Sequence, residues 1–342
     1  MISRLVFAVV AALVGAGCAL PAAAEDFYAG KQINLIVGAG VGGGYDLQAR
    51  LTARHLGKHI PGHPSIIVQN MPAAGGIQAT NHIYSGAPKD GTMIALVQRG
   101  MLLAKLTYPQ SVRFEIDKLN WIGSLNSEVA VAIAWHTSPV KKAEDLFVQE
   151  LVVGAAGATD QSNIFPTALN RVLGTKFKVV AGYRGSADNA LALERGEVAG
   201  IGGMNFSSIQ ATRPDWLKDA KVNVLLQLSL QRHPELPNVP TALDIGRTDT
   251  EKTVLKLVFA QSQMGRAVFA PPGLAPDRTN VLRAAFQSMV KDPEFLAEAN
   301  KGSIEINQPM SGQEMAQLVS QLHSSAPELI KRASEAIAVA GQ

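Results

Sequence analysis

Short apolar segments alternate with segments of helical periodicity along most of the chain. The short segments are rich in Val, Ile and Leu, as buried strands are, and span residues 32–37, 65–69, 93–97, 128–134, 151–154, 177–181, 198–202 and 222–228. The helical segments span residues 46–59, 76–85, 163–173, 186–195, 276–290 and 312–326. This alternation predicts an α/β fold with mostly parallel sheets, in which ligands bind at the carboxyl ends of the strands.

Glycines follow the first of these strands, at the point where a helix begins. Residues 35–50 read LIVGAGVGGGYDLQAR, so a bare loop joins the apolar strand to a helix that starts near Asp46. The first N–H groups of a helix lack partners and its N-terminus carries a partial positive charge, so such a loop attracts anions. We therefore expect this loop to approach a small anionic ligand.

A dinucleotide is the less favoured ligand for this loop. Gly38, Gly40 and Gly43 fit the pattern G-x-G-x-x-G. That fingerprint also needs an acidic residue about 20 positions further on, and no Asp or Glu lies between Asp46 and Asp90. We therefore expect no cofactor.

The chain begins with the features of a secretory signal peptide. Arg4 precedes an apolar run at residues 5–13, and three alanines stand directly before Glu25. The run is shorter than a membrane span needs, so a membrane anchor is the less favoured alternative. We predict that residues 1–24 are removed and that the mature protein is periplasmic and monomeric.

Cys18 is the only cysteine in the chain. Removal of the signal peptide would leave none, which excludes disulfide bonds, a thiolate nucleophile and a cysteine metal site. Lipidation at Cys18 ranks second to plain cleavage, because Gly15, three places before it, is small where a lipoprotein site has a larger apolar residue.

Composition and motifs exclude several functions. The chain has 31 Lys plus Arg against 28 Asp plus Glu and no dense basic run, so we expect no nucleic-acid partner. Neither a G-x-S-x-G elbow nor an H-E-x-x-H motif occurs. We therefore expect no enzymatic activity, with an exported hydrolase of carboxylated substrates as the alternative. The length of 342 residues suits two domains.

Three histidines repeat at a spacing of four residues: His55, His59 and His63. This spacing could place metal ligands on one face of a helix, but Pro61 and Gly62 interrupt that helix. No carboxylate stands near them in sequence. We expect solvated surface histidines and no metal site.

Five short motifs resemble, in order, those of the tripartite tricarboxylate transporter receptors, the Bug family of periplasmic solute-binding proteins. The first resembles V-P-F-x-P-G-G-x-x-D-x-x-A-R and is matched by Val37, Gly42, Gly43, Asp46, Ala49 and Arg50. The others resemble N-x-P-G-A-G-G followed by P-D-G, Y-K-G, L-P-D-V-P-T and F-A-P-A-G; they stand at residues 70–76 with 89–91, 183–185, 236–241 and 269–273.

This resemblance implies a two-domain periplasmic binding protein of a type II-like fold. Each domain would be a mostly parallel sheet flanked by helices, with the ligand in the cleft between them. We expect domain 1 at residues 25–125 plus 250–342 and domain 2 at residues 126–249. The chain would cross near residues 121–134 and return by residues 234–240 or 258–272.

By the same resemblance, the receptor would close on a small organic carboxylate. It would deliver that ligand to the membrane subunits of a secondary transporter of the tripartite tricarboxylate type. A binding protein that serves a sensor is an alternative that the sequence does not separate.

Candidate ligand-binding residues lie in loops after the predicted strands. In the resembling family two glycine loops frame a ligand carboxylate; here they supply Ala39, Gly40, Val41, Gly42, Gly43, Tyr45, Asp46, Ala74, Gly75 and Gly76. For Gly42 and Gly43 the alternatives are a turn with positive φ and a close approach to the ligand. For Asp46 we favour a residue that only stabilises the helix N-terminus, because an anionic ligand would repel it. The alternatives are that Asp46 orients the loop or contacts a ligand hydroxyl.

Further candidates are Thr159, Ser162, Gly203 and Asn205 from the second domain, and two arginines, Arg99 and Arg184. Each arginine follows a strand and could pair with a second carboxylate, although arginines at such positions are more often solvated.

The first motif departs from the family pattern where a ligand would lie. Gly38, Ala39 and Val41 stand where the family has Pro, Phe and Pro. The identity of the ligand therefore does not transfer. Loss of the large Phe side chain predicts a changed pocket, with Tyr45 or Trp135 available to stack on an aromatic or longer ligand.

Overall fold

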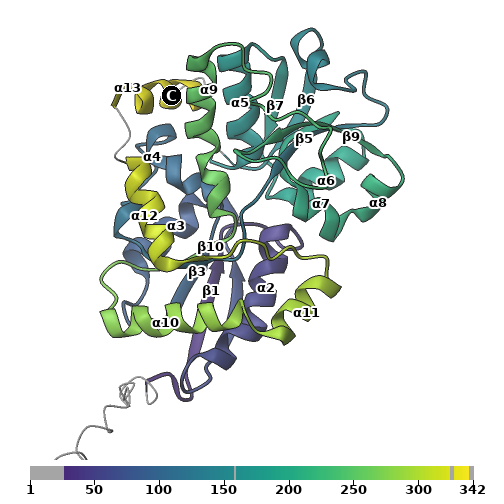
Figure 1. The fold of residues 1–342 in the computed structure, drawn as a ribbon. Helices are drawn as coiled ribbons and strands as arrows, with labels where there is room; N and C mark the ends of the chain where they lie inside the picture. The colour runs from purple at the N-terminus through teal and green to yellow at the C-terminus, as the bar shows by residue number, and fades with distance from the viewer. Residues whose placement is uncertain (1–26, 158, 324–326, 339–342) are drawn as a thin grey trace, which may run out of the picture.

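The computed structural model describes residues 27–157, 159–323 and 327–338, which form two α/β lobes (Figure 1). The predicted signal peptide and Cys18 lie outside these residues. The sheet of the first lobe has the order β11-β4-β10-β3-β1-β2; its strands are β1 (Gln32–Val37), β2 (Ser65–Asn70), β3 (Met93–Leu96), β4 (Asn120–Ser124), β10 (Ala267–Ala270) and β11 (Met310–Ser311). The sheet of the second lobe has the order β7-β6-β8-β5-β9; its strands are β5 (Ala130–Trp135), β6 (Leu151–Ala155), β7 (Phe177–Ala181), β8 (Gly200–Asn205) and β9 (Val222–Leu228).

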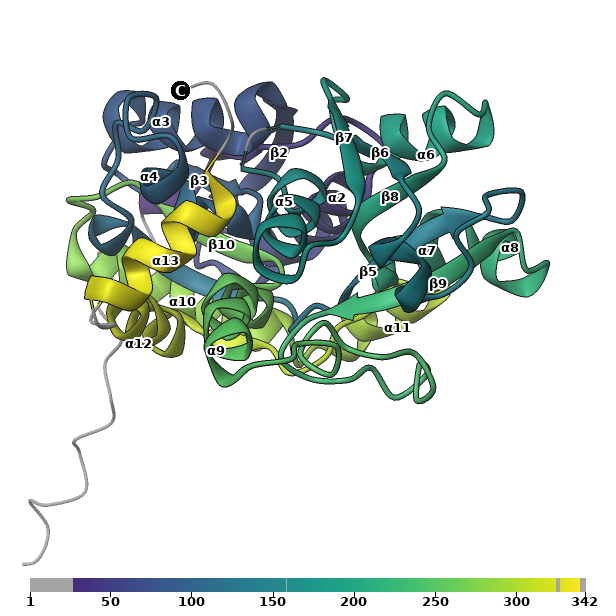
Figure 2. The same ribbon diagram turned by 90° about the horizontal axis from the view of Figure 1, so that it is seen from above.

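Helices lie on both faces of each sheet (Figure 2). Those of the first lobe are α2 (Gly44–Leu56), α3 (Ile77–Gly86), α4 (Ala104–Thr107), α10 (Pro276–Met289), α11 (Pro293–Lys301) and α12 (Gly312–His323). The second lobe carries α5 (Gln161–Leu173), α6 (Ser186–Glu194), α7 (Phe206–Thr212), α8 (Pro214–Lys218), α9 (Asp249–Phe259) and α13 (Pro327–Ile337). Within the described residues, no helix has the length and apolarity that a membrane span requires.

Strand β1 is buried on both faces, which explains its unbroken apolar sequence. Ile33, Leu35 and Val37 pack in the apolar cluster that also contains residues of α2 and α10. Ile36 points to the opposite face and packs in the cluster that contains residues of α3. The strand therefore ends in the middle of the lobe, with the first glycine loop at its carboxyl end.

Both sheets are mixed, so the predicted α/β class is confirmed but the expectation of mostly parallel pairing is too simple. Strands β1, β2 and β3 pair in parallel, as do β6, β7 and β8. β10 runs antiparallel to β3 and β4, and β5 runs antiparallel to β8 and β9. β5 and β10 are the strands that enter each sheet directly after the chain has crossed from the other lobe.

Among the described residues, two connecting segments pass between the lobes: residues 125–129 and residues 260–266. Both lie within the predicted crossings at residues 121–134 and 258–272. The other predicted return route, residues 234–240, stays beside β9, where Gln227 Nε2 donates to the carbonyl oxygens of Leu236 and Val239 at 2.9 and 2.7 Å.

A third segment, residues 303–309, runs along the first crossing. The N–H of Ser127 donates to the carbonyl oxygen of Asn307 at 3.2 Å, and Nε2 of His233 lies 3.5 Å from Glu305 Oε1. The nearby carboxylate of Glu305 raises the pKa of His233 above its usual value, against the opposing effect of burial. This contact ties the loop after β9 of the second lobe to a segment of the first.

Helices α9 and α13 pack against α5, although both fall in the part of the chain assigned by prediction to domain 1. Helix α13 also reaches back to the first lobe, because the hydroxyl of Ser334 donates to the carbonyl oxygen of Leu106 in α4 at 3.0 Å. The division into domains by sequence range stays a prediction.

The expectation of solvated histidines is wrong for His55. This side chain is buried, and its Nε2 lies 2.6 Å from Glu298 Oε2 of α11. His59 Nε2 lies 3.0 Å from Asp292 Oδ2. Their carboxylate partners are remote in sequence, so only packing of α11 on α2 brings them together. Among the described residues no cluster of histidines and carboxylates has the composition of a metal site.

Asp46 braces the first glycine loop. Its carboxylate accepts hydrogen bonds from the N–H of Gly42 at 2.9 Å, from Arg50 Nε at 3.0 Å and from Asn70 Nδ2 at 2.9 Å. Burial opposes ionisation of Asp46, but these hydrogen bonds outweigh it and lower its pKa below the usual value. Asp46 lies in the first turn of α2, as the favoured expectation has it, and it also orients the loop, which was only the alternative.

We predict that Asp46→Asn lowers the unfolding free energy by about 1–3 kcal/mol near neutral pH, because hydrogen bonds to a buried charge are lost. The native pKa is depressed, so this contribution is present above the unfolded pKa and disappears as the pH falls through the folded pKa. Urea unfolding at neutral and acidic pH should show the gap between native and variant protein closing in acid.

The matched control is Asp249→Asn, an exposed carboxylate in the first turn of α9. Its effect should stay within about 0.5 kcal/mol. An Asp46→Asn variant as stable as the native protein at neutral pH would show that the loop holds its shape without this carboxylate.

Candidate ligand-binding cleft

A small cavity of about 20 Å³ lies between the two lobes. Its walls come from the first glycine loop and from the loops at the ends of the second-lobe strands; the lining residues are Ala39, Gly40, Gly43, Tyr45, Gln98, Asp160, Gln161, Ser162, Gly185, Ser186, Asn189, Ile201, Gly203, Met204, Asn205, Ser208 and Arg266. Most follow the carboxyl ends of β1, β3, β6, β7 and β8, where α/β sheets bind ligands. A volume of this size holds little more than one water molecule, so a larger ligand enters only when the lobes separate.

Two helix N-termini, one from each lobe, open onto this cavity. Helix α2 begins after Gly43 and helix α6 after Gly185, and neither N-cap glycine supplies a side-chain hydrogen bond. Their first N–H groups are thus not satisfied by capping side chains, and the two helix dipoles favour negative charge at the same place. Helix α5 differs, because its N-cap Asp160 accepts a hydrogen bond from the N–H of Ser162 at 2.9 Å.

Gly42 and Gly43 are glycines for two different reasons. Gly42 has a φ of 82° and open space where a Cβ would stand, so it serves the turn. Gly43 has a φ of −86°, which any residue adopts, but an added Cβ would lie 2.7 Å from Ser186 Oγ of the other lobe. Close approach across the cleft therefore explains Gly43. The N–H of Gly40 also crosses, donating to the carbonyl oxygen of Arg184 at 3.1 Å.

The second glycine loop contacts the opposite lobe directly and does not line the cavity. Ala74, Gly75 and Gly76 all have positive φ, at 51°, 62° and 99°. The hydroxyl of Thr159 donates to the carbonyl oxygen of Gly75 at 2.9 Å. A Cβ at Gly157 would lie 2.1 Å from the backbone nitrogen of Gly75. These predicted residues thus form a contact between the lobes.

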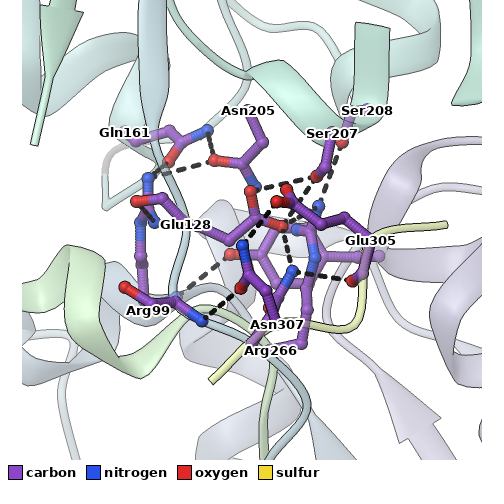
Figure 3. Close-up of polar contacts among 12 residues, drawn as sticks. Arg99, Glu128, Gln161, Asn205, Ser207, Ser208, Arg266, Glu305 and Asn307 are labelled. Carbon is purple, nitrogen blue, oxygen red and sulfur yellow. Dashed lines mark hydrogen bonds and ion pairs between the residues drawn. The ribbon is translucent and has the colours of Figure 1, made fainter. Parts of the chain in front are cut away.

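Arg99 is buried at 3% exposure and joins the first lobe to cleft residues of the second (Figure 3). Its Nη2 donates to Gln161 Oε1 and, at 3.0 Å, to Asn205 Oδ1, while Nη1 donates to the carbonyl oxygen of Glu128 at 3.2 Å. Burial lowers the pKa of Arg99. Arg99, which was predicted to pair with a second carboxylate of the ligand, thus donates to protein acceptors instead. It orients the side-chain amides of Gln161 and Asn205 in the cavity wall.

Arg266 and Glu128 form a buried ion pair that sequence reasoning missed (Figure 3). Arg266 Nη2 lies 3.0 Å from Glu128 Oε1, and the two residues are 0% and 1% exposed. The hydroxyl of Ser207 also donates to Glu128, at 2.8 Å. The guanidinium of Arg266 lies over the ring of Tyr45, 4.0 Å from its centroid. The sequence signal for Arg266 is slight: one charge directly before the apolar run of β10.

Other predicted residues lie outside the cavity. The Arg184 side chain is 75% exposed and pairs with Asp188 at 2.8 Å, and Val41 is 67% exposed. Trp135 packs against Trp216 with ring centroids 5.7 Å apart. Tyr45 does line the cavity, but Arg266 covers one face of its ring. The aromatic rings that were expected to stack on a ligand therefore pack against protein side chains in this structure.

The cavity residues that sequence reasoning missed follow the same rules that pointed to the first loop. Ser186 and Asn189 lie in the first turn of α6, directly after the motif Tyr183-Arg184-Gly185. A glycine followed by a helix start was the signal for Gly43, and it would also have found Gly185. Gln98 and Ser208 carry no comparable sequence signal, because only the packing of the lobes brings them to the cavity.

Comparison with known sequences identifies relatives over nearly the whole chain. The model of the tripartite tricarboxylate transporter family receptors (TctC) matches residues 49–334. The UPF0065 protein in the gbd 5′ region of Cupriavidus necator is 25% identical over 322 residues, covering 92% of this chain and 91% of that protein. A UPF0065 protein of Bordetella pertussis is 26% identical over 315 residues, with 90% and 92% covered.

Solved structures share the fold. The periplasmic binding protein BugD superposes with a TM-score of 0.71 at 20% identity, covering 90% of this chain and 98% of that one. MatC from Rhodopseudomonas palustris with bound malate has a TM-score of 0.70 at 22% identity, covering 90% and 99%. Rpa4515 of R. palustris with adipate has a TM-score of 0.70 at 19% identity, covering 89% and 97%.

The family expected from the five short motifs is thereby confirmed, as is the two-lobed α/β fold. The chain belongs to the tripartite tricarboxylate transporter family of receptors, which are solute-binding proteins and not enzymes.

Proposed function

We propose that this chain binds a small organic carboxylate in the cleft between its lobes and presents it to the membrane subunits of a tripartite tricarboxylate-type transporter. The observation that carries the proposal is the meeting of two helix N-termini at one cavity, each with a glycine N-cap and no capping side chain. Their N–H groups and dipoles suit a carboxylate. The buried Arg266 in the same wall adds positive charge.

Relatives of the same fold support the ligand class. MatC was solved with bound malate and Rpa4515 with adipate, and both ligands are small organic carboxylates. Their identity to this chain is 22% and 19%, so they support the class and leave the particular ligand open. The altered first loop places Ala39 in the cavity wall where the resembling family has Phe.

In this proposal the ligand-holding groups are the first glycine loop, Asn205 and Ser162, with Gly203 in the wall behind them. The second glycine loop and Thr159 complete the contact between the lobes. Transfer to a transporter requires that the membrane partner distinguish the loaded from the empty receptor. Closure of the lobes supplies that difference, because it changes the surface that spans both.

We further propose that the protein is exported through the segment at residues 1–24, without a lipid at Cys18, and works as a monomer. The support is the charged start, the short apolar run and the alanines before Glu25. We predict that intact-mass spectrometry of the exported protein finds an N-terminus at Glu25. A chain beginning with a diacylated Cys18 would contradict this assignment.

We predict that Gly43→Val abolishes carboxylate binding while the fold survives. The φ of −86° at Gly43 suits valine, so the first lobe is not strained. The new Cβ would lie 2.7 Å from Ser186 Oγ, which must rotate away, and the branched side chain would fill the space between the two helix N-termini. A thermal-shift screen of carboxylates tests this, because a ligand at 100 times its Kd stabilises the native protein by about 2.7 kcal/mol.

Gly86→Val provides the matched control for this substitution. Gly86 is exposed at the end of α3, where an added Cβ would make an ordinary contact with His82 at 3.5 Å. This variant should bind like the native protein. Unchanged affinity in Gly43→Val would place the carboxylate site elsewhere.

We predict that ligand binding draws the lobes together about the crossing segments at residues 125–129 and 260–266. A ligand held by both lobes binds their closed arrangement better than their open one, and that difference in affinity drives closure. Small-angle X-ray scattering should give a smaller radius of gyration with saturating ligand. Adding the same ligand to the Gly43→Val variant should leave its radius of gyration unchanged. Identical scattering profiles for the native protein with and without ligand would contradict closure.

A further inference from the structure

Arg266 enters the cleft from the second crossing segment, at a point where the two crossings touch. A Cβ added to the preceding residue, Gly265, would lie 2.1 Å from the carbonyl oxygen of Asn126 in the first crossing. Only glycine permits this approach. It places Arg266 beside the start of α2, where a Cβ at Gly44 would lie 2.9 Å from Arg266 Nη2.

The guanidinium of Arg266 is fully buried, and only part of its hydrogen-bonding capacity is used. Arg266 is 0% exposed, and its Nη2 lies 3.0 Å from Glu128 Oε1 and 3.0 Å from Ser208 Oγ. An arginine has five N–H donors. Nε and Nη1, which carry three of them, have no acceptor among the residues that the structure describes. Buried donors without acceptors are costly, so these groups indicate that an acceptor completes the site.

Arg99, the other buried arginine near the cleft, is placed differently. Both of its Nη atoms donate to protein acceptors, on Gln161, Asn205 and the backbone of Glu128, and among the described residues only its Nε lacks an acceptor. Arg99 also does not line the cavity, whereas Arg266 does. The direct contact with an anion that sequence reasoning expected of Arg99 therefore falls to Arg266.

Charge at the cleft indicates a ligand with more than one negative charge. Two buried arginines, Arg99 and Arg266, face one buried carboxylate, Glu128. Of the two other carboxyl groups near the cavity, Asp46 is paired with Arg50 at 3.0 Å, and burial raises the pKa of Asp160. A monocarboxylate held at the two helix N-termini would leave positive charge at Arg266 without full compensation. A second carboxylate would meet it with charge-assisted hydrogen bonds.

We propose that Arg266 is the specificity-determining residue of the cleft and that it binds a second carboxylate of the ligand, so that this receptor selects dicarboxylates over monocarboxylates. The inference rests on the proposed function, in which the N-termini of α2 and α6 hold the first carboxylate. Tyr45, whose ring lies 4.0 Å beneath the guanidinium, and Glu128 fix the plane in which Arg266 presents its donors.

Calorimetric titration with linear dicarboxylates from succinate to adipate, each beside its half-amide, tests the proposal. A half-amide has nearly the same shape and one charge fewer. The native protein should prefer the best-bound dicarboxylate by roughly tenfold to a hundredfold, as charge-assisted hydrogen bonds predict. In the double variant Glu128→Gln with Arg266→Met, the ratio of the half-amide Kd to the dicarboxylate Kd should fall to about one, while half-amide binding persists.

The double variant removes both members of the ion pair together, because Arg266→Met alone would leave Glu128 buried and uncompensated. If it does not fold, Arg266→Lys replaces it. Lysine keeps the charge opposite Glu128 but not the planar set of donors. The preference of the Arg266→Lys variant for the dicarboxylate should therefore be several-fold weaker than that of the native protein. Arg195→Gln is the control, since Arg195 is exposed beside Glu197 on the second lobe and should keep the native preference.

The outcomes separate the two proposals. If the native protein binds half-amides as tightly as dicarboxylates, or if the double variant or Arg266→Lys keeps the native preference, the role of Arg266 is overturned and carboxylate binding stands. If the native protein binds none of these carboxylates, both proposals are overturned. A preference that is present in the native protein and in Arg195→Gln, and lost with the guanidinium, supports the assignment.

Discussion

The buried ion pair between Arg266 and Glu128 joins the two segments through which the chain passes between its lobes. Removing one member of such a pair costs about 3–5 kcal/mol, because the remaining charge stays in a medium that solvates it poorly. Glu128 also accepts from Ser207, and its backbone carbonyl accepts from Arg99. The crossings are therefore held by a polar network that contacts the strand ends of both lobes (Figure 3).

The lobes meet at positions where glycine permits a close approach. A Cβ added at Gly43, Gly157 or Gly265 would lie 2.7 Å or less from an atom of the opposite lobe or of the other crossing segment. Each of these glycines serves a contact between segments that are remote in sequence. The cleft is thus formed by two backbone surfaces in close approach, with helix N-termini facing the space between them. Such a surface binds a small anion through N–H groups and dipoles and needs few charged side chains.

Much of the fold could be predicted because its strands are buried on both faces and its helices are amphipathic. β1, β7 and β9 begin and end at the predicted residues, and α5 and α10 lie within two residues of prediction. β4 and β10 were missed. β10 has four residues, too few for a pattern, and it pairs with strands separated from it by the whole second lobe. A strand that forms only when its sheet is already assembled leaves little local signal.

The sequence by itself determined the α/β class and the family, and it predicted the first glycine loop as an anion-binding element. Each of these depends on local pattern: periodicity, a helix start and motifs of adjacent residues. It left a turn and a close approach open for both Gly42 and Gly43, and it named Arg99 as a candidate but missed Arg266. Tertiary structure decided those points. Whether a glycine serves a turn or a close contact depends on what lies opposite it, and whether a buried arginine has donors left depends on which acceptors packing brings to it. Both are properties of groups far apart in the chain, so no local pattern contains them.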